Sequence, residues 1–400
     1  MWRGILRVLL VTILSIVLVS GAFIGGYAFS RQVFPPAPPP DGGAPASWQP
    51  YFPVFWEAWN YVHRDFYKTP IDDSELTYGS ISGMVDALND PHTQFTEAKI
   101  AKITSTELQG SFEGIGATVE MQQGRLTIVA PIKDSPADKA GLLPGDIVLK
   151  VNDTIIQNMD VNQAVSLIRG PKGTPVTLLI QRIKQQPFSV TIIRDTIRTP
   201  FVESRMIEGT DLAYLRLNEF GATAPDEMNA ALTQLLAQHP KGLIFDLRRN
   251  GGGLLTVGID VASEFLKGGQ TVMIERTKDG ATQELKSHNG GLATEIPMVL
   301  LIDGGSASAS EIVSAALKDY GRATLIGTKT YGKGSVQYVN TMKDGSELRV
   351  TTAHFFSPKD HAIDGVGITP DIEVKITQDD LANKRDPQLD RAIQFLTTGK

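Results

Sequence analysis

Two apolar stretches in the second half of the chain each run into a loop made mostly of glycine, alanine, serine and other small residues. Residues 242–247 are followed by Asn-Gly-Gly-Gly at 250–253, and residues 298–302 by Asp-Gly-Gly-Ser-Ala-Ser-Ala-Ser at 303–310. Short apolar stretches bounded by glycine are typical of buried strands, and the segments beside them have helical spacing. This arrangement predicts an α/β unit at residues 196–375.

The composition changes several times along the chain, and these changes predict a multidomain α+β fold class. The predicted parts are a signal anchor or transmembrane helix at 1–30, a Pro-rich tether at 31–50, a helical segment at 51–103, a unit of short strands at 104–195, the α/β unit at 196–375 and a C-terminal helical tail at 376–400. At roughly 100–200 residues per domain, a chain of 400 residues accommodates two or three domains.

The N-terminus carries an uncharged, mostly apolar run of 23 residues from Val8 to Ser30. About 20 apolar residues span a bilayer as a helix, whereas the core of a cleaved signal peptide is usually about 7–15 residues long. Arg3 and Arg7 precede the run, and this bias places the N-terminus in the cytoplasm. We therefore expect a single-pass cell-membrane protein whose remaining parts are extracytoplasmic, with cleavage near residues 28–30 as the alternative.

Large apolar side chains recur at helical spacing in the segment 51–103. The first stripe consists of Phe52, Phe55, Trp56, Trp59 and Val62, and a second one lies within residues 81–88. Spacings of three and four residues place each stripe on one face of a helix. We expect the aromatic stripe in a hydrophobic core; the alternative is a surface for a second copy of the chain or another partner.

The residue composition excludes several kinds of chemistry. The chain has no Cys and six His, so disulfides, thiolate metal sites and a thiol nucleophile are excluded, and a His-rich metal site has few ligands. Its 44 acidic and 38 basic side chains give a net charge of −6, which argues against a nucleic-acid partner held through phosphate contacts. Any nucleophile must therefore come from Ser, Thr, Lys, Asp or Glu.

The two small-residue loops have properties of a site where negative charge develops. The glycines at 251–253 leave backbone N–H groups accessible, and such groups bind anions or oxyanions. The serines begin a predicted helix, whose dipole favours negative charge at that end. The alternatives are a flexible turn for the glycines and an ordinary cap for the serines. Spacing alone does not choose among Ser306, Ser308 and Ser310.

A lysine in a third glycine-rich loop supplies a candidate base. Residues 327–334 nearly match the phosphate loop G-x-x-x-x-G-K-[ST], but Gly334 occupies the place of the hydroxyl that binds Mg²⁺, which argues against nucleotide binding. Lys333 can act as a base if burial lowers its pKa. His354 and His361 are alternative bases. The carboxylates that end strands or lie in turns are expected to act as caps: Asp246, Asp303 and Asp364.

Residues 135–152, together with Gly-Ile-Gly at 114–116 and Leu-Ile-Arg-Gly at 167–170, resemble a PDZ domain. The resemblance implies a PDZ domain at 104–195 that binds protein C-termini. In that mode an extended peptide adds a strand to a sheet edge, and N–H groups of a glycine-containing loop hold its terminal carboxylate. The corresponding loop here consists of Glu113, Gly114, Ile115 and Gly116.

The loops of the α/β unit, taken in order, resemble the carboxyl-terminal processing peptidases, also called tail-specific proteases. The matching motifs are Asn-Gly-Gly-Gly at 250–253, Gly-Ser-Ala-Ser-Ala-Ser-Glu at 305–311 and Thr-Tyr-Gly-Lys-Gly-Ser-Val-Gln at 330–337. The resemblance implies a serine endopeptidase, without cofactor or metal, whose substrates are proteins with accessible, apolar C-termini. It also implies the site: Ser308 as nucleophile, Lys333 as its base 25 residues on, Gln337 as support for the lysine, and Ala309 with Gly252 or Gly253 as the oxyanion hole.

Two expectations concern regulation and the alternative function. Arg169 ends the PDZ-like helix just before Gly-Pro-Lys-Gly at 170–173, a predicted junction with the protease unit, where it is a candidate coupling residue. The alternative is a solvated Arg that favours the helix dipole. A catalytically inactive PDZ scaffold at the membrane is the alternative to an enzyme, although the intact Ser308, Lys333 and Gln337 argue against it.

Overall fold

The computed structural model describes residues 51–399, apart from residues 123 and 160. It divides into two compact units after Glu75. The predicted anchor at 1–30 and tether at 31–50 lie outside the described residues. Among the helices that are described, none is long and apolar enough to cross a membrane.

Helix α2 (Phe52–Asp65) carries the predicted aromatic stripe, but none of its residues is buried. Phe52, Phe55, Trp56 and Val62 are each at least 38% exposed. The rings contact one another instead, with centroids 5.1 Å apart for Phe55 and Trp56. The expectation of a core is therefore wrong for this helix in the part of the chain that the structure describes.

The rest of the helical segment contains helix α3 (Asp73–Asp86), strand β1 (Gln94–Thr96) and helix α4 (Ala98–Glu107). The sequence does not predict β1, which pairs antiparallel with the distant strand β18 (Glu347–Phe356), with Gln94 opposite Arg349. This pairing brings the turn at residues 89–93 to the sheet that follows the lysine loop.

Residues 111–198 form a strand-rich unit around its own hydrophobic core, which includes Leu126, Ile128 and Leu178. The elements are β2 (Ser111–Gly114), β3 (Ala117–Gln122), β4 (Arg125–Pro131), α5 (Pro136–Lys139), β5 (Ile147–Val151), β6 (Thr154–Ile155), α6 (Val161–Ile168), β7 (Pro175–Gln181), β8 (Phe188–Ile193) and β9 (Asp195–Arg198). The sheet order is β3-β4-β5-β7-β8 with β6 beside β5, and β2 pairs separately with β9. β3 is therefore an edge strand.

A six-stranded sheet forms the centre of the α/β unit. Its elements, with the helices between them, are β10 (Val202–Met206), β11 (Leu212–Leu217), α7 (Ala224–Leu236), β12 (Gly242–Asp246), α8 (Leu255–Ser263), β15 (Met298–Ile302), α9 (Ala309–Asp319), β16 (Thr324–Gly327) and β19 (Ile372–Glu373). The strand order is β10-β11-β12-β15-β16-β19, and every neighbouring pair except β10 with β11 is parallel.

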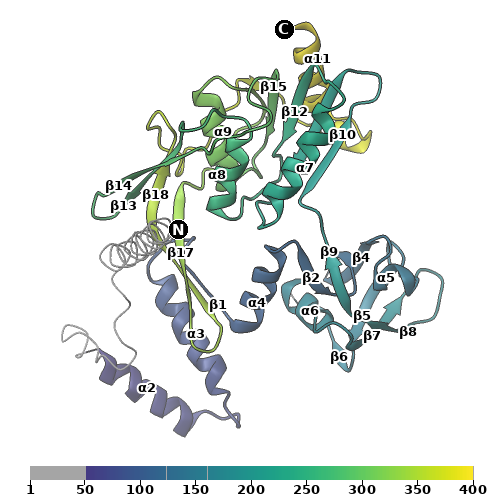
Figure 1. The fold of residues 1–400 in the computed structure, drawn as a ribbon. Coiled ribbons are helices and arrows are strands. Elements are labelled where there is room, and N and C mark those ends of the chain that lie inside the picture. The colour runs from purple at the N-terminus through teal and green to yellow at the C-terminus, as the bar shows by residue number, and fades with distance from the viewer. Residues whose placement is uncertain (1–50, 123, 160, 400) are drawn as a thin grey trace, which may run out of the picture. The chain divides into compact units, whose positions relative to one another are not determined.

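Helices cover both faces of this sheet (Figure 1). Side chains alternate between faces along a strand, so Phe245 and Leu300 join the core with α7, α8 and α9, whereas Ile244 points to the other face. That second face is covered by α11 (Pro387–Thr398), which follows α10 (Gln378–Ala382). The C-terminal helices thus supply a layer of the core, and the unit has three layers, α/β/α.

A second sheet lies beside the three layers. It contains β13 (Thr271–Thr277), β14 (Thr282–Lys286), β17 (Ser335–Thr341), β18 and β1. Its order is β1-β18-β13-β14, with β17 paired to the other edge of β18. β17 begins two residues after Lys333, so this sheet connects directly to the lysine loop.

Candidate active site

The three predicted loops lie at one edge of the central sheet. β12, β15 and β16 are parallel neighbours, so their carboxyl ends meet at the same edge. Backbone hydrogen bonds join the loops that follow. The N–H of Ala307 donates to the carbonyl of Asn250 (3.0 Å), and the N–H of Tyr331 donates to that of Ser306 (3.0 Å).

The structure separates the three serines, which the sequence pattern alone does not. Ser306 and Ser310 are fully buried, and their hydroxyls donate to the carbonyls of Leu247 and Asn250, each at 2.8 Å. Ser308 is only partly buried and lies at the N-cap of α9. Of the three hydroxyls, the one at 308 is therefore the one open to a substrate.

The backbone of Ser308 is strained, with φ of 55° and ψ of −116°. A residue other than glycine in such a region costs about 1–3 kcal/mol and persists only where its surroundings enforce it. Here Glu311 accepts the Ser308 N–H at 3.0 Å, and Asn250 anchors the preceding Ala307.

Glu311 ties the serine helix to the lysine loop. Its fully buried carboxylate accepts four hydrogen bonds. One oxygen accepts the N–H groups of Ser308 (3.0 Å) and Lys333 (2.8 Å), and the other accepts the Thr330 hydroxyl (2.5 Å) and the Gly332 N–H (2.7 Å). Sequence reasoning missed this role. Its only local signal is a Glu three residues after a serine, the capping-box spacing.

Lys333 is a partly buried amine with a lowered pKa. Burial is the main cause, the positive charge of Arg349 adds to it, and the negative charges of Asp90 and Glu311 oppose it. Among the contacts of the described chain, no hydrogen bond joins the Lys333 amine to the Ser308 hydroxyl. The hydrogen bonds to the Glu311 carboxylate thus bring the two loops together without a direct bond between their functional atoms. Catalytic hydrogen bonds commonly tighten only when substrate binds.

Gln337 lies on β17, opposite Thr351 of β18. Its side-chain amide donates to the hydroxyls of Ser335 (2.9 Å) and Thr351 (3.2 Å). Neither partner is Lys333, so any support of the lysine by this amide is indirect in the geometry seen here.

The glycine loop packs directly against the serine. Gly252 has φ of +103°, and a Cβ added to it would lie 2.8 Å from Ser308 Cβ and 3.0 Å from the Ala309 nitrogen. The Gly252 N–H, however, donates to the side chain of Asn250 at 2.9 Å. Gly253 lies opposite Phe220 in a short parallel pairing. The residues on either side of Gly253 make the hydrogen bonds: the Gly252 carbonyl accepts the Phe220 N–H, and the Leu254 N–H donates to the Phe220 carbonyl. Within the described contacts, the N–H groups of Gly253 and Ala309 have no acceptor.

A buried charge cluster anchors the start of the glycine loop. Asp246, at the end of β12, accepts hydrogen bonds from the Tyr214 hydroxyl (2.7 Å) and from Arg248 (2.6 Å). Arg248 also donates to Asp386 at 2.8 Å, just before α11. Burial and the nearby Asp246 raise the pKa of Tyr214 to about 12. Burial of Arg248 disfavours its positive charge. The hydrogen bonds to Asp246 and Asp386 outweigh this effect of burial and raise the pKa of Arg248.

The remaining carboxylates and histidines of the predicted site have structural partners. Asp303 accepts the N–H groups of Arg249 (2.8 Å) and Gly305 (2.9 Å), and Asp364 accepts that of Gly334 (3.0 Å). The side chains of His354 and His361 contact Asp364 (3.5 Å) and Asp319 (3.7 Å). In the described chain no group of three or more His, Asp or Glu side chains could hold a metal ion.

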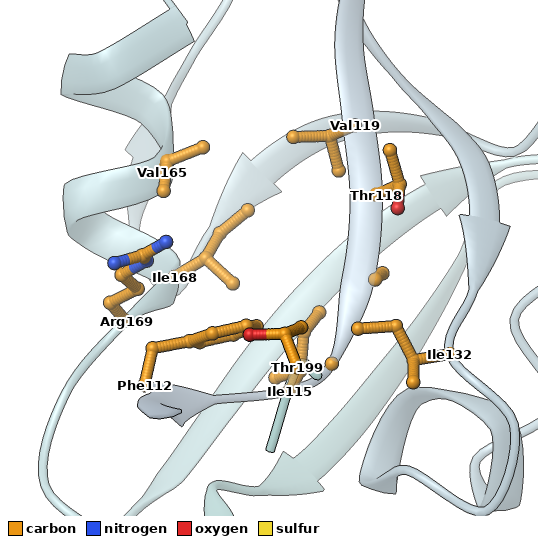
Figure 2. Close-up of a pocket in the computed structure, with 11 residues that line it drawn as sticks. Phe112, Ile115, Thr118, Val119, Ile132, Val165, Ile168, Arg169 and Thr199 are labelled. Atoms are coloured by element: carbon orange, nitrogen blue, oxygen red, sulfur yellow. The ribbon is translucent and has the colours of Figure 1, made fainter. Parts of the chain in front are cut away.

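The strand-rich unit contains an apolar groove with a cavity of about 270 Å³. Figure 2 shows Val119 and Thr118 of β3 facing Val165 and Ile168 of α6 across it. β3 is the edge strand of its sheet, so its outer edge can accept another strand. The groove is therefore shaped for an extended apolar peptide.

Only part of the predicted carboxylate loop reaches the groove. Glu113 and Gly114 belong to β2 and pair with Thr196 and Asp195. Ile115 and Gly116 line the groove. Their N–H groups have no acceptor among the described contacts, so a peptide carboxylate would find its donors here.

Arg169 lines the same groove, and its guanidinium lies 4.6 Å above the ring of Phe112. The segment 170–173 that follows leads into β7 of the same sheet. The expectation that this segment joins the protease unit is therefore wrong. The chain leaves the strand-rich unit for the α/β unit only after β9, because β9 pairs with β2 and so belongs to the strand-rich unit.

Comparisons with known proteins agree with both resemblances. The family model described as Peptidase family S41 matches residues 211–374, and the one described as PDZ domain matches residues 127–182. The carboxy-terminal-processing protease of Bartonella bacilliformis is 41% identical over 317 residues, covering 78% of this chain and 72% of its own. The carboxy-terminal processing protease CtpA of Bacillus subtilis is 37% identical over 320 residues, covering 80% and 68%.

A solved structure extends the comparison to the fold. The structure of a photosystem II D1 C-terminal processing protease matches with a TM-score of 0.50 and 26% identity, over 80% of this chain and 92% of that one. Together with the identity to the curated relatives, these findings show that the chain belongs to the carboxy-terminal processing proteases of peptidase family S41 and is a serine-type peptidase.

Proposed function

We propose that the chain cleaves proteins near their C-termini with a dyad of Ser308 and Lys333. One observation carries the assignment of the nucleophile: Ser306 and Ser310 are fully buried and bonded to backbone carbonyls, whereas Ser308 is partly exposed. The lowered pKa of Lys333, caused mainly by burial, favours the neutral amine that a base must be.

The chemistry follows from these groups. Neutral Lys333 accepts the proton of the Ser308 hydroxyl while its oxygen bonds to the scissile carbonyl carbon. The resulting oxyanion receives hydrogen bonds from the N–H groups of Ala309 and Gly253, since that of Gly252 is held by Asn250. The carbon–nitrogen bond then breaks, and protonated Lys333 gives its proton to the departing amine. Lys333, now neutral again, deprotonates a water molecule, whose oxygen bonds to the acyl carbon. The bond between that carbon and the Ser308 oxygen then breaks, and the lysine returns the proton to the serine hydroxyl.

Substrate choice is assigned to the PDZ groove. An apolar C-terminal segment would lie along β3, with its side chains against Val165 and Ile168 and its carboxylate near Ile115 and Gly116. We further propose that Arg169 senses this occupancy, because its guanidinium stands over Phe112 at the end of the groove. Normal stimulation of Arg169→Ala by an apolar peptide would contradict that role.

Anchoring and assembly are proposed from the N-terminal region. The apolar run at residues 8–30, preceded by Arg3 and Arg7, supports a membrane anchor with the protease on the extracytoplasmic side. The uncovered aromatic stripe of α2 supports pairing with a second copy of the chain. Sedimentation of the full chain in detergent, with and without Trp56→Glu, tests this pairing: a dimer that survives the substitution contradicts it.

The central test compares cleavage of an unfolded protein that ends in an apolar tail. Ser308→Ala and Lys333→Ala should each abolish cleavage while binding of the tail persists. Ser204→Ala, which removes an exposed hydroxyl on β10, is the matched control and should cleave normally. If the unmodified chain binds the tail but never cleaves it, the alternative of an inactive PDZ scaffold is correct.

A further inference from the structure

One edge of strand β17 has no partner strand in the described chain. β17 and β18 form an antiparallel hairpin, and both strands are labelled in Figure 1. β1 and β13 pair with residues of β18 that also pair with β17, so they lie on the opposite edge of β18. The outer edge of β17 is therefore open, and its main-chain N–H and C=O groups are available to another strand.

Every second residue of β17 presents its main chain to this open edge. The N–H of Met342 donates at 2.7 Å to the carbonyl of Ser346, just before β18. Because alternate residues of an antiparallel strand bond to the same neighbour, the N–H groups of Asn340 and Tyr338 also face β18. Those of Val339 and Thr341 consequently face outward.

This edge lacks the features that protect sheet edges from further pairing. Proteins guard such edges with charged side chains, proline or very short strands. β17 is seven residues long, and its sequence Ser-Val-Gln-Tyr-Val-Asn-Thr contains neither a charge nor a proline. The other edge strands of the two sheets in the protease unit are guarded. β10 and β14 each carry one acidic and one basic side chain, and β1 and β19 have three and two residues.

The open edge starts beside the proposed base. β17 begins two residues after Lys333, and the carbonyl of Gly334 accepts the N–H of Phe355 at 2.8 Å, so the ladder with β18 starts at the residue next to the lysine. Tyr338 and Val339 are 55% and 43% exposed, and apolar side chains of an added strand would contact them. A polypeptide whose scissile bond lies at the dyad can therefore continue along β17.

We propose that the substrate binds as an added strand along the outer edge of β17. The bound part is an extended, apolar segment without proline, on one side of the scissile bond, and main-chain hydrogen bonds to Val339 and Thr341 hold it. This site is distinct from the PDZ groove, which takes the C-terminal end. The inference rests on the proposed dyad, because the position of Lys333 at the start of β17 identifies the added strand as substrate.

A proline substitution tests the edge from the enzyme side. Proline is tolerated in an edge strand where the N–H would face solvent, so Val339→Pro removes one outward donor and leaves the ladder with β18 in place. The probe is a synthetic peptide that ends in an apolar tail and is long enough to cover both the dyad and β17. Val339→Pro should raise its KM roughly fivefold, the effect of one lost main-chain hydrogen bond, with kcat unchanged. Val339→Thr keeps the N–H and a branched side chain, and should leave both constants unchanged.

N-methylation of the peptide main chain tests the same bonds from the substrate side. Each N-methyl group removes one N–H donor, and in an added strand only every second residue points its N–H at β17. KM should therefore rise at alternate positions of the bound segment and stay unchanged at the positions between them. At the residue opposite Val339, the effects of N-methylation and of Val339→Pro should not add, because both disrupt the same pair of residues.

A small activated ester separates this inference from the proposed dyad. Val339 lies about 20 Å along the strand from Lys333, at about 3.3 Å per residue, so an acetyl ester reacts at Ser308 without reaching it. Normal acylation of Val339→Pro with a raised KM for the long peptide supports the inference. Normal acylation with an unchanged KM overturns it. Failure of the unmodified chain to be acylated at Ser308 contradicts the dyad instead.

A second copy of the chain is the other strand that such an edge accepts. Sedimentation in detergent distinguishes the two: a dimer that Val339→Pro dissociates, together with an unchanged KM, would assign the edge to self-association and overturn the inference. If Val339→Pro does not fold, Thr341→Pro takes its place, because it removes the next outward N–H. Its matched control is then Thr341→Val, which keeps that N–H.

Discussion

Replacing Glu311 by Gln should separate the serine helix from the lysine loop. Each carboxylate oxygen accepts two hydrogen bonds, one pair from Ser308 and Lys333 and the other from Thr330 and Gly332. Gln has only one accepting oxygen, so in either orientation one pair of donors faces an NH₂ group. A buried donor left without an acceptor costs about 1–3 kcal/mol. Two such donors make local opening easier by about 4 kcal/mol.

Hydrogen exchange measures this opening. In a Ser308→Ala background, which removes self-cleavage, Glu311→Gln should speed exchange in the peptides covering residues 306–312 and 330–334 together. In the active chain the same substitution should lower kcat/KM by about 100-fold, the effect expected when reacting groups are displaced by about 1 Å. Glu208→Gln, which changes an exposed carboxylate, should alter neither quantity. Unchanged exchange in both peptides would refute the reasoning.

Three further predictions follow from the described contacts. Burial lowers the pKa of Lys333, so the unfolded chain binds its proton more tightly; stability should therefore rise with pH between that lowered pKa and the ordinary value of 10.5. Unfolding measured at neutral and alkaline pH should show this rise disappear in Lys333→Met, which should also be more stable at pH 7; a rise of equal size in the variant contradicts the assignment. Gly252→Ala should abolish activity, because its Cβ would lie 2.8 Å from Ser308 Cβ at a φ of +103°; Gly251→Ala, where nothing lies within 4 Å, should retain it, and equal activities of the two variants would contradict the packing argument. Tyr214→Phe removes the donor to Asp246 and should lower the free energy of unfolding by about 1–2 kcal/mol. Absorbance titration should at the same time lose the tyrosine that ionises near a pKa of about 12, and an unaltered titration would mean that Tyr214 is not that group.

Much of the fold could be predicted from local patterns. The apolar stretch at 298–302 is strand β15 with the same bounds, and the stretch at 242–247 contains strand β12, because buried strands need uninterrupted apolar residues. The glycine and serine loops lie at strand ends, as predicted, for the same reason. The unit of short strands predicted at 104–195 contains the strands β2 to β9.

Contacts between distant segments could not be predicted. Nothing in residues 94–96 indicates that they pair with residues 347–349, because three residues carry too little pattern to specify a partner. The choice of Ser308 over Ser306 and Ser310 by exposure depends on the carbonyls of Leu247 and Asn250, which lie in the separate loop after β12. The aromatic stripe of α2 has a core-like period, but burial depends on a partner surface that the period does not reveal.

The mapping of an acyl group tests the central claim most directly. The full chain is mixed with an activated acyl ester, quenched at low pH, and digested for mass spectrometry. The account predicts one acylated serine, Ser308, with Ser306 and Ser310 unmodified and the adduct lost in Lys333→Met. An acyl group on another serine, or undiminished acylation of Ser308 in Lys333→Met, would contradict the proposed dyad.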